Sequence, residues 1–216
     1  MKFRIVLADD HNLFREGLRS LLQGIEGVEV IGEAENGRSA VLLCRELRPD
    51  LVIMDVAMPE LNGIEAARLI MEDDPDARII ALSMHSSRRF VLDMLQAGAM
   101  AYLLKNSAFK ELAAALAAVK SGRAYLSPAI AAVVVEKIAS PDHEGGGGPG
   151  VLTAREREVL QLLAEGLKVT DIGAKLNVSV KTVQTHRRNI MAKIKVKSLP
   201  ELTKFALQHG LTTLDH

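Results

Sequence analysis

Apolar runs alternate with helical patterns through the first 123 residues of the chain. Short runs rich in Val, Ile and Leu predict strands at 3–8, 28–34, 51–55, 77–83 and 101–104. Between and after them, apolar residues recur every three to four positions, which predicts helices at 12–23, 37–47, 63–72, 88–97 and 108–121. This alternation predicts an α/β fold, a doubly wound five-stranded parallel sheet with helices on both faces.

The last third of the chain carries helical patterns alone. Apolar spacing predicts four helices, at 154–165, about 170–176, 180–194 and about 201–209. Thr153 with Glu156 and Ser198 with Glu201 have capping-box spacing, and Ser179 is placed as the N-cap of the third of these helices. A small all-α domain of four helices is therefore expected here.

A glycine-rich segment separates the two patterns. Residues 144–150 read EGGGGPG, which offers no apolar side chain to bury and is typical of an interdomain linker. Just before it, 128–139 predict one more helix. We therefore divide the chain into an α/β domain at 1–123, a helical and Gly-rich linker at 124–150, and an all-α domain at 151–216.

Composition narrows the class of protein. The chain is 48% hydrophobic and 25% charged, as in ordinary globular proteins, and no run of 18 apolar residues predicts a membrane span. Cys44 is the only cysteine, which excludes disulfide frameworks and cysteine metal clusters and favours a cytoplasmic location. The N-terminus is unlike a signal peptide, because acidic residues interrupt its apolar run early.

The formal net charge of zero conceals two oppositely charged halves. Residues 151–216 carry 11 Lys and Arg against 6 Asp and Glu, so the rest of the chain carries the matching negative excess. Within 168–197 there are 8 basic residues and a single acidic one, Asp171. Such a basic segment beside an acidic domain favours an anionic partner for the second half alone.

Polar residues stand where the predicted strands end. Asp9 and Asp10 follow the first strand, Asp55 ends the third, Ser83 the fourth, and Lys105 follows the fifth. The carboxyl ends of parallel strands share one edge, so these groups should converge there. Clustered carboxylates repel unless a cation lies among them, and Mg²⁺ prefers such oxygen ligands. An Asp beside a divalent cation and Lys is a candidate nucleophile for phosphoryl transfer.

The same segments resemble the receiver domain of bacterial two-component response regulators, a flavodoxin-like fold. The resemblance covers 3–121 and rests on ADD (8–10), MDVAMP (54–59), ALS (81–83) and GAMAYLLK (98–105). It implies that Asp55 is the phospho-acceptor and that Mg²⁺ is the cofactor. It further implies metal ligands at Asp10, Asp55 and the Ala57 carbonyl, a water-mediated role for Asp9, and contacts from Ser83 and Lys105 to the phosphoryl oxygens.

Two nearby residues, Tyr102 and His11, each have two possible interpretations, and a third, Asn106, departs from the family pattern. Tyr102 matches the family's switch aromatic, which turns inward as the residue at the Ser83 position moves; taken alone, it is a strand aromatic with its hydroxyl at the surface. His11 is expected to be an exposed residue of a first helical turn rather than a phosphate relay. Asn106 stands where many receivers carry proline.

The predicted helix 180–194 has an apolar face and a polar face. Val180, Val183, Ile190 and Ile194 share the apolar face, which should pack on the domain core. Lys181, Gln184, Thr185 and Arg188 lie opposite, a combination suited to a DNA major groove. A merely solvated charged face is the alternative, and the concentrated positive charge of the segment argues against it.

Residues 151–209 resemble the LuxR-type helix-turn-helix, which together with a receiver defines the NarL/FixJ class of response regulators. The resemblance implies base contacts by Gln184, Thr185 and Arg188, phosphate contacts by Lys181, Thr182 and Lys193, and dimer formation through the last helix. The family usually has Lys at the position of Gln184, so its consensus DNA site is not carried over. Leu199-Pro200 also replaces a common Arg-Thr.

The chain is thus expected to be a phosphorylation-dependent transcription regulator. The resemblance implies a sensor histidine kinase as phosphodonor, homodimer formation after phosphorylation and binding to promoter DNA, with no membrane partner. It is not expected to be an enzyme, apart from the receiver's part in its own phosphorylation and dephosphorylation. One rival is a Mg²⁺-dependent phosphohydrolase, which usually needs an Asp at the position of Ala57. A second is a constitutive DNA binder, which would not need the acidic pair, Asp55 and Lys105.

Overall fold

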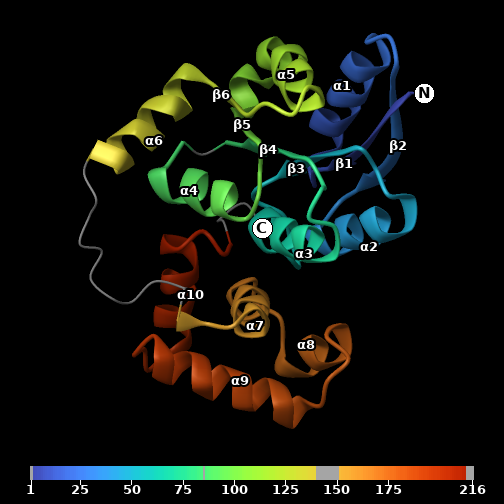
Figure 1. Cartoon of the computed structure of the whole chain (residues 1–216). Helices are drawn as coiled ribbons and strands as arrows, with labels where there is room; N and C mark the ends of the chain where they lie inside the picture. Colours follow the sequence, from blue (N-terminus) through green and yellow to red (C-terminus); the bar gives the residue numbers. More distant parts are fainter. Residues whose placement is uncertain (1, 85, 140–150, 213–216) are drawn as a thin grey trace. The chain divides into compact units, whose positions relative to one another are not determined.

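The computed structural model describes residues 2–84, 86–139 and 151–212 (Figure 1). The chain divides into two compact units, Met1–Asp142 and His143–His216. The predicted glycine linker at 144–150 lies outside the described residues.

The N-terminal unit is built on a parallel sheet in which β3 occupies the interior. The sheet order is β2-β1-β3-β4-β5-β6, and every neighbouring pair is parallel. The strands are β1 Phe3–Ala8, β2 Val28–Ala34, β3 Leu51–Asp55, β4 Ile79–Ser83, β5 Ala101–Leu104 and β6 Tyr125–Leu126. All five predicted strands are present, and a two-residue strand extends the sheet beyond β5. That strand is too short for its alternation to be visible in the sequence.

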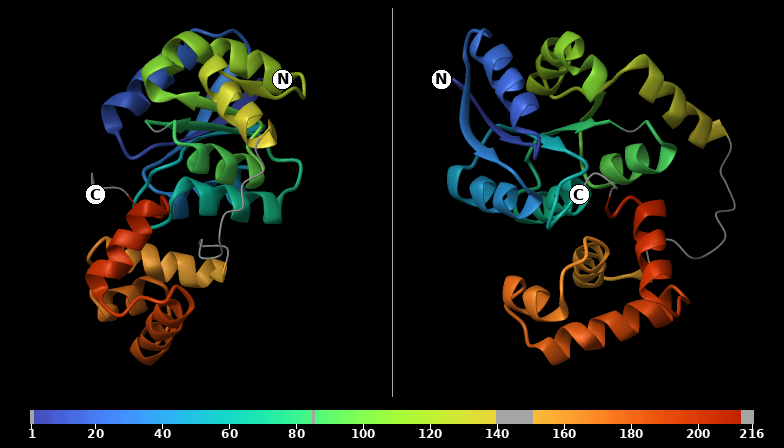
Figure 2. Two further views of the ribbon diagram at one scale, coloured as in Figure 1. Left: turned by 90° about the vertical axis from the view of Figure 1, so that its left-hand side faces the viewer. Right: turned by 180° about the vertical axis from the view of Figure 1, so that it is seen from behind.

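Helices cover both faces of this sheet (Figures 1 and 2). They are α1 Asn12–Gln23, α2 Gly37–Leu47, α3 Gly63–Asp73, α4 Arg88–Gln96, α5 Lys105–Lys120 and α6 Pro128–Ala139. Leu18 of α1 and Leu112 of α5 belong to one buried cluster, whereas Ala40 of α2 and Ile70 of α3 belong to the other. The doubly wound layout predicted from the alternation is confirmed.

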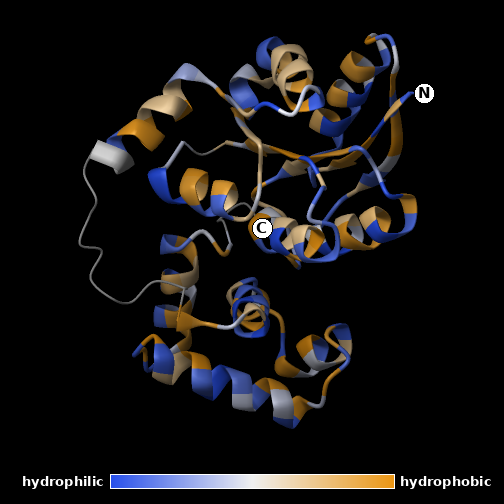
Figure 3. Cartoon of the chain, viewed as in Figure 1, coloured by the Kyte–Doolittle hydropathy of each residue, from blue (hydrophilic) through white to orange (hydrophobic). Residues whose placement is uncertain are grey.

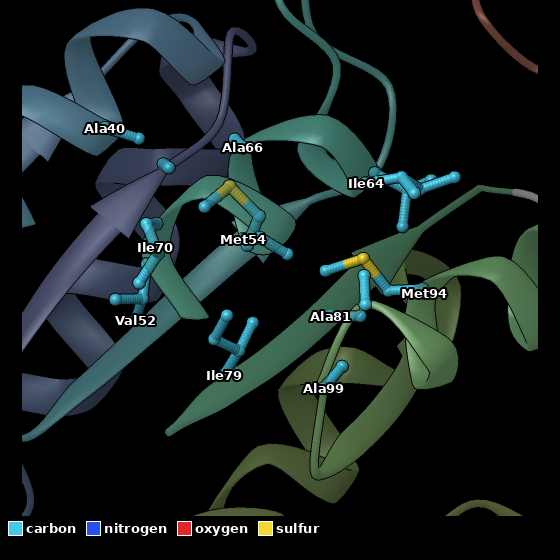
Figure 4. Packing of buried hydrophobic residues seen from close by; sticks show 14 of the residues in the cluster. Ala40, Val52, Met54, Ile64, Ala66, Ile70, Ile79, Ala81, Met94 and Ala99 are labelled. Atoms are coloured by element: carbon cyan, nitrogen blue, oxygen red, sulfur yellow. The ribbon is translucent and has the colours of Figure 1, made fainter. Parts of the chain in front are cut away.

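Along each central strand, alternate side chains belong to the two buried clusters on opposite faces of the sheet. Val52 and Met54 of β3 pack with α2 and α3, as Figure 4 shows, while Leu51 and Ile53 belong to the opposite cluster. Because successive strand residues face opposite sides, a strand covered on both sides must be apolar throughout. That requirement explains the unbroken apolar run that precedes Asp55.

Helix α5 begins at Lys105, three residues earlier than its apolar spacing predicts. The residue before a proline is pushed out of the helical region, so a proline at 106 would disfavour this start. Asn106 removes that restriction and lets the helix follow β5 directly. The side chain of Lys105 is therefore carried by the first residue of a helix.

The C-terminal unit contains α7 Ala154–Ala164, α8 Val169–Lys175, α9 Val180–Lys193 and α10 Leu199–Gln208. Thr153 and Glu156 form the predicted capping box, and Ser179 caps α9 by accepting from the Thr182 N–H. At α10, Ser198 accepts from the Glu201 N–H, and the Glu201 carboxylate accepts from the Lys197 N–H at 2.7 Å and from Ser198. The core includes Val159, Ile172, Val183, Ile190 and Leu202.

No helix among the described residues is long and apolar enough to cross a membrane.

Candidate functional site

The polar residues predicted at the strand ends are brought together at one edge of the sheet. Asp9 follows β1, Asp55 and Ser83 are the last residues of β3 and β4, and Lys105 follows β5. Asp9, Asp55, Ser83 and Lys105 are all buried, at 1%, 2%, 0% and 6% exposure. A buried polar cluster of this kind costs free energy unless its members satisfy one another.

The Lys105 ammonium joins two of the carboxylates. Its Nζ lies 2.6 Å from Asp55 Oδ2 and 2.8 Å from Asp9 Oδ2. The other Asp55 oxygen, Oδ1, accepts from the Ala57 N–H at 3.1 Å. The backbone beyond Asp55 is held by Gly63, whose N–H donates to the Val56 carbonyl; a Cβ at Gly63 would lie 1.9 Å from the Asp55 carbonyl oxygen.

Burial and neighbouring charge act in opposite directions on these groups. The pKa of Asp55 is raised to about 7: burial is the largest cause, Lys105 acts to lower the pKa, and the Asp9 carboxylate acts to raise it. Burial alone would lower the pKa of Lys105, but Asp55 and Asp9 more than offset this, so its pKa lies above the ordinary value. The cluster therefore carries more carboxylate than one ammonium can neutralise.

The remaining acidic residue, Asp10, completes a group with metal-ligand geometry. Ligand atoms of Asp9, Asp10, His11 and Asp55 all lie within 4.8 Å of one another. Three carboxylates against the single ammonium of Lys105 leave negative charge that a divalent cation would balance. The donor set thus fits a bound metal ion.

Tyr102 is placed next to Ser83, inside the N-terminal unit. The Tyr102 side chain is fully buried, and its hydroxyl shares a hydrogen bond with the Ser83 side chain. Burial raises the pKa of Tyr102 above its ordinary value, so the hydroxyl stays neutral. The reading of Tyr102 as a strand aromatic with a surface hydroxyl was wrong, because the ring belongs to the buried cluster that contains Met54 and Met94.

Arg15 is a functional candidate that sequence reasoning missed. Its guanidinium donates to the Asp9 carbonyl, to Asn12 Oδ1 at 2.9 Å, to Glu33 at 2.9 Å and to Glu35 at 3.0 Å. Arg15 is only 5% exposed. One signal was present in the sequence: Arg15 lies three residues before Leu18, on the apolar face of the predicted helix.

The predicted recognition face lies on α9, whose ribbon carries many hydrophilic positions (Figure 3). Lys181, Gln184, Thr185 and Arg188 are exposed, and Thr182 is half-buried. On the opposite face Val183 and Ile190 are fully buried; Val180, placed in the core by its spacing, is 41% exposed because it begins the helix. The Thr185 hydroxyl donates to the Lys181 carbonyl at 2.9 Å, which leaves its methyl group and oxygen lone pairs for a partner.

Lys193 is exposed as a residue, but its ammonium is already paired. The Nζ atom donates to Glu156 Oε2 at 2.6 Å, and Glu156 is the buried carboxylate of the α7 capping box. This ion pair joins the C-terminal end of α9 to the start of α7. Burial would raise the pKa of Glu156, but hydrogen bonds from Lys193 and Thr153 hold it below its ordinary value.

Comparison with protein families finds two matches along the chain. Residues 5–117 match the response regulator receiver domain, and residues 150–206 match the bacterial regulatory proteins of the LuxR family. Response regulator GacA of Pseudomonas protegens is 37% identical over 96% of this chain and 97% of its own. Response regulator UvrY of Escherichia coli is 36% identical over 96% of this chain and 94% of its own. The chain belongs to the two-component response regulators of the NarL/FixJ class.

Two solved structures of RcsB resemble this response regulator over nearly the whole chain. An RcsB–DNA complex is 30% identical, with a TM-score of 0.59, and the alignment covers 95% of this chain and 98% of that one. RcsB from Salmonella enterica, bound to a promoter in the presence of the phosphomimetic BeF₃⁻, is 30% identical with a TM-score of 0.62 over 98% and 100% of the two chains. The regulator is thus a DNA-binding transcription regulator with a receiver domain.

Proposed function

We propose that Asp55 accepts a phosphoryl group from a sensor histidine kinase and that this modification switches dimer formation and promoter binding. The observation that carries the proposal is the convergence of Lys105, Asp9 and the Ala57 N–H on one buried carboxylate. In the transfer, an Asp55 oxygen attacks the phosphorus of a phosphohistidine, the P–N bond breaks, and its electron pair returns to the imidazole. The product is a mixed acyl phosphate on Asp55.

The residues around Asp55 have distinct roles in this proposal. Mg²⁺, when bound, supplies positive charge for the oxygens of the transferring group. Asp10, Asp55 and the Ala57 carbonyl would hold it, and Asp9 would act through water. Lys105 orients Asp55 before transfer and holds a phosphoryl oxygen afterwards, because its ammonium lies 2.6 Å from the reacting carboxylate.

Ser83 and Tyr102 form the proposed switch. Ser83 is the last residue of β4, the strand next to β3, and its hydroxyl is hydrogen-bonded to Tyr102. A phosphoryl oxygen on Asp55 is a stronger acceptor than a phenol, because it is charged. Ser83 would donate to it and release its contact with Tyr102, which couples the chemistry at Asp55 to the buried side of β5.

The acceptor is tested with a small phosphodonor and Mg²⁺ on the purified chain. Wild type should gain one acid-labile phosphate and shift toward dimer, as read by intact-protein mass spectrometry and light scattering. Asp55→Asn should gain none, while circular dichroism shows an unchanged fold. Labelling of the Asn variant at the wild-type level would remove Asp55 from the acceptor role.

For the DNA-binding domain, we propose that Gln184, Thr185 and Arg188 contact bases and that Lys181, Thr182 and Lys193 lie near phosphates. The first three are exposed on the α9 face opposite Val183 and Ile190. Lys193 is engaged by Glu156, so a phosphate contact requires it to share or leave that partner. The location that goes with this function is the cytoplasm, where the bacterial chromosome lies.

Base contact and charge contact predict different mutant behaviour. Arg188→Ala should cost about 1–3 kcal/mol on the preferred site and relax preference at one or two base pairs. Lys181→Ala should weaken all sequences alike and lower the salt slope by roughly one unit. Fluorescence anisotropy with specific and random duplexes at several salt concentrations separates the two. Equal losses on both duplexes for Arg188→Ala would show that Arg188 reads no base.

A further inference from the structure

His11 is exposed, as predicted, and its imidazole also lies against the carboxylates of Asp9 and Asp10. Its Nδ1 lies 2.9 Å from Asp10 Oδ1 and 3.5 Å from Asp9 Oδ1, and its backbone N–H donates to Asp9 Oδ1 at 2.8 Å. His11 is the N-cap of α1, with extended backbone (φ −84, ψ 99), and its side chain makes no cap hydrogen bond. The β1–α1 turn therefore aims the imidazole at the carboxylates.

The imidazole occupies the solvent side of the cluster. The side chain of His11 is 55% exposed and that of Asp10 16%, whereas those of Asp9 and Lys105 are 1% and 5% exposed. Lys105 lies deeper, between Asp9 and Asp55, and reaches within 3.4 Å of His11 Nδ1. A cation arriving from solvent would thus meet Asp10 and His11 first, with the buried carboxylates behind them.

The donor set decides which cations fit. Three carboxylates alone suit Mg²⁺, but one imidazole nitrogen within 4.8 Å of all three makes a mixed nitrogen and oxygen set. Imidazole nitrogen is a favoured ligand of divalent first-row transition metals, and Mg²⁺ takes oxygen ligands almost exclusively. His11 therefore adds a ligand that discriminates between the two classes of cation.

We propose that His11 Nδ1 is a direct ligand at the acceptor site and that the site binds a divalent first-row transition ion, such as Mn²⁺, more tightly than Mg²⁺. The proposal rests on the proposed acceptor site and adds a nitrogen ligand to it. Asp10, Asp55 and the Ala57 carbonyl would supply oxygens to the same ion, and water would fill the remaining positions on the exposed side.

Mn²⁺ is the probe, because its electron paramagnetic resonance reports both affinity and ligand type. Loss of the free-ion signal gives the Kd, and electron spin-echo modulation detects a directly bound ¹⁴N nucleus. Wild type should show ¹⁴N coupling and bind Mn²⁺ at least about tenfold more tightly than Mg²⁺, as measured by competition. His11→Asn should lose the coupling and most of this preference; Asn is a good N-cap, so α1 should be preserved.

His186→Ala is the matched control, because His186 lies on α9 in the other domain, and its coupling should equal that of wild type. Absence of ¹⁴N coupling in wild type, or its persistence in His11→Asn, overturns the proposal. The acceptor function is read separately, as acid-labile phosphate on wild type with Mg²⁺ alone. Phosphate without ¹⁴N coupling overturns only the nitrogen ligand, and coupling without phosphate overturns only the acceptor function.

Discussion

At the scale of single residues, the cluster of Asp9, Asp10 and Asp55 depends on Arg15. In the described contacts, Arg15 does not touch Asp55. The guanidinium of Arg15 holds the Asp9 carbonyl on one side and carboxylates from the end of β2 and beyond on the other. A buried arginine with this many charge-assisted bonds fixes the turn that carries Asp9 and Asp10. Arg15 is therefore a positioning residue for the metal ligands.

Removing Arg15 should damage stability and metal binding together. Arg15→Ala leaves the Asp9 carbonyl and Glu33 without a buried donor, which should lower the free energy of unfolding by about 1–3 kcal/mol. The Kd for Mg²⁺ should rise at the same time. Arg19→Ala is the control, because Arg19 is half-exposed and, among the described residues, forms an ion pair only with Glu33; it should change stability by less than about 0.5 kcal/mol. Urea titrations and metal titrations of both variants measure this; unchanged Mg²⁺ affinity in Arg15→Ala would contradict the positioning role.

At the scale of elements, the sequence predicted most of the sheet but not all of what surrounds it. Strands covered on both faces must be apolar throughout, so the apolar runs in the sequence predicted them. The polar residues at the ends of these runs predicted the edge of the sheet at which the site lies. The start of α5 at Lys105 was not predicted. It depends on the absence of a proline at 106, which would push Lys105 out of the helical region, and apolar spacing carries no information on this. The burial of Tyr102, the bonds of Arg15 and the pairing of Lys193 with Glu156 are tertiary contacts between distant segments, and no local pattern specifies them.

Helix α6 shows the same limit, because its packing was not predictable from its spacing. Ile130 is fully buried in the cluster that also contains Met94 of α4, whereas Val135 is 63% exposed. Ile130→Ala should therefore destabilise the receiver by about 2–5 kcal/mol, and Val135→Ala should have little effect. Thermal unfolding followed by circular dichroism measures both. Equal small effects would mean that α6 belongs to the linker, as the predicted domain boundary at 123 implies.

The ion pair between α7 and α9 gives the DNA-binding domain a pH dependence of known sign. The folded pKa of Glu156 lies below its ordinary value, so its stabilising contribution is present above the unfolded pKa. That contribution is lost as the pH falls through the lower, folded pKa. Glu156→Gln should cost about 1–3 kcal/mol at neutral pH, because it removes charge-assisted bonds to Lys193 and Thr153.

The cost of Glu156→Gln should shrink as the pH falls below the ordinary range of glutamate. Urea unfolding of the variant and wild type at neutral and acidic pH tests the sign. Glu158→Gln is the control, since Glu158 pairs with Arg155 on the same helix. A cost for Glu156→Gln that stays constant with pH would show that the carboxylate is not the stabilising form.

At the scale of the whole molecule, the chain joins an acidic unit to a basic one with no net charge overall. The positive excess of 151–216 supports the long-range attraction to DNA, whereas the negative excess of the receiver opposes it. Binding to random DNA should therefore fall steeply with salt, and a fragment of 151–216 should bind it more tightly than the full chain at low salt. Anisotropy titrations from low to physiological salt measure both effects, and equal affinity of fragment and full chain would contradict the electrostatic account.

The buried contact between Tyr102 and Ser83 also means that tyrosine fluorescence can report the proposed switch. The chain has no tryptophan and two tyrosines, so Tyr125→Phe leaves Tyr102 as its only tyrosine, which can be excited at wavelengths where phenylalanine does not absorb. A phenol that loses a hydrogen-bond partner inside a core changes its quantum yield. Adding phosphodonor and Mg²⁺ to this variant should therefore change its tyrosine emission at the rate at which phosphate appears on Asp55. When Asp55→Asn is added to this variant, the emission should stay constant. Intrinsic tyrosine fluorescence would then measure the rate of the switch without an added label.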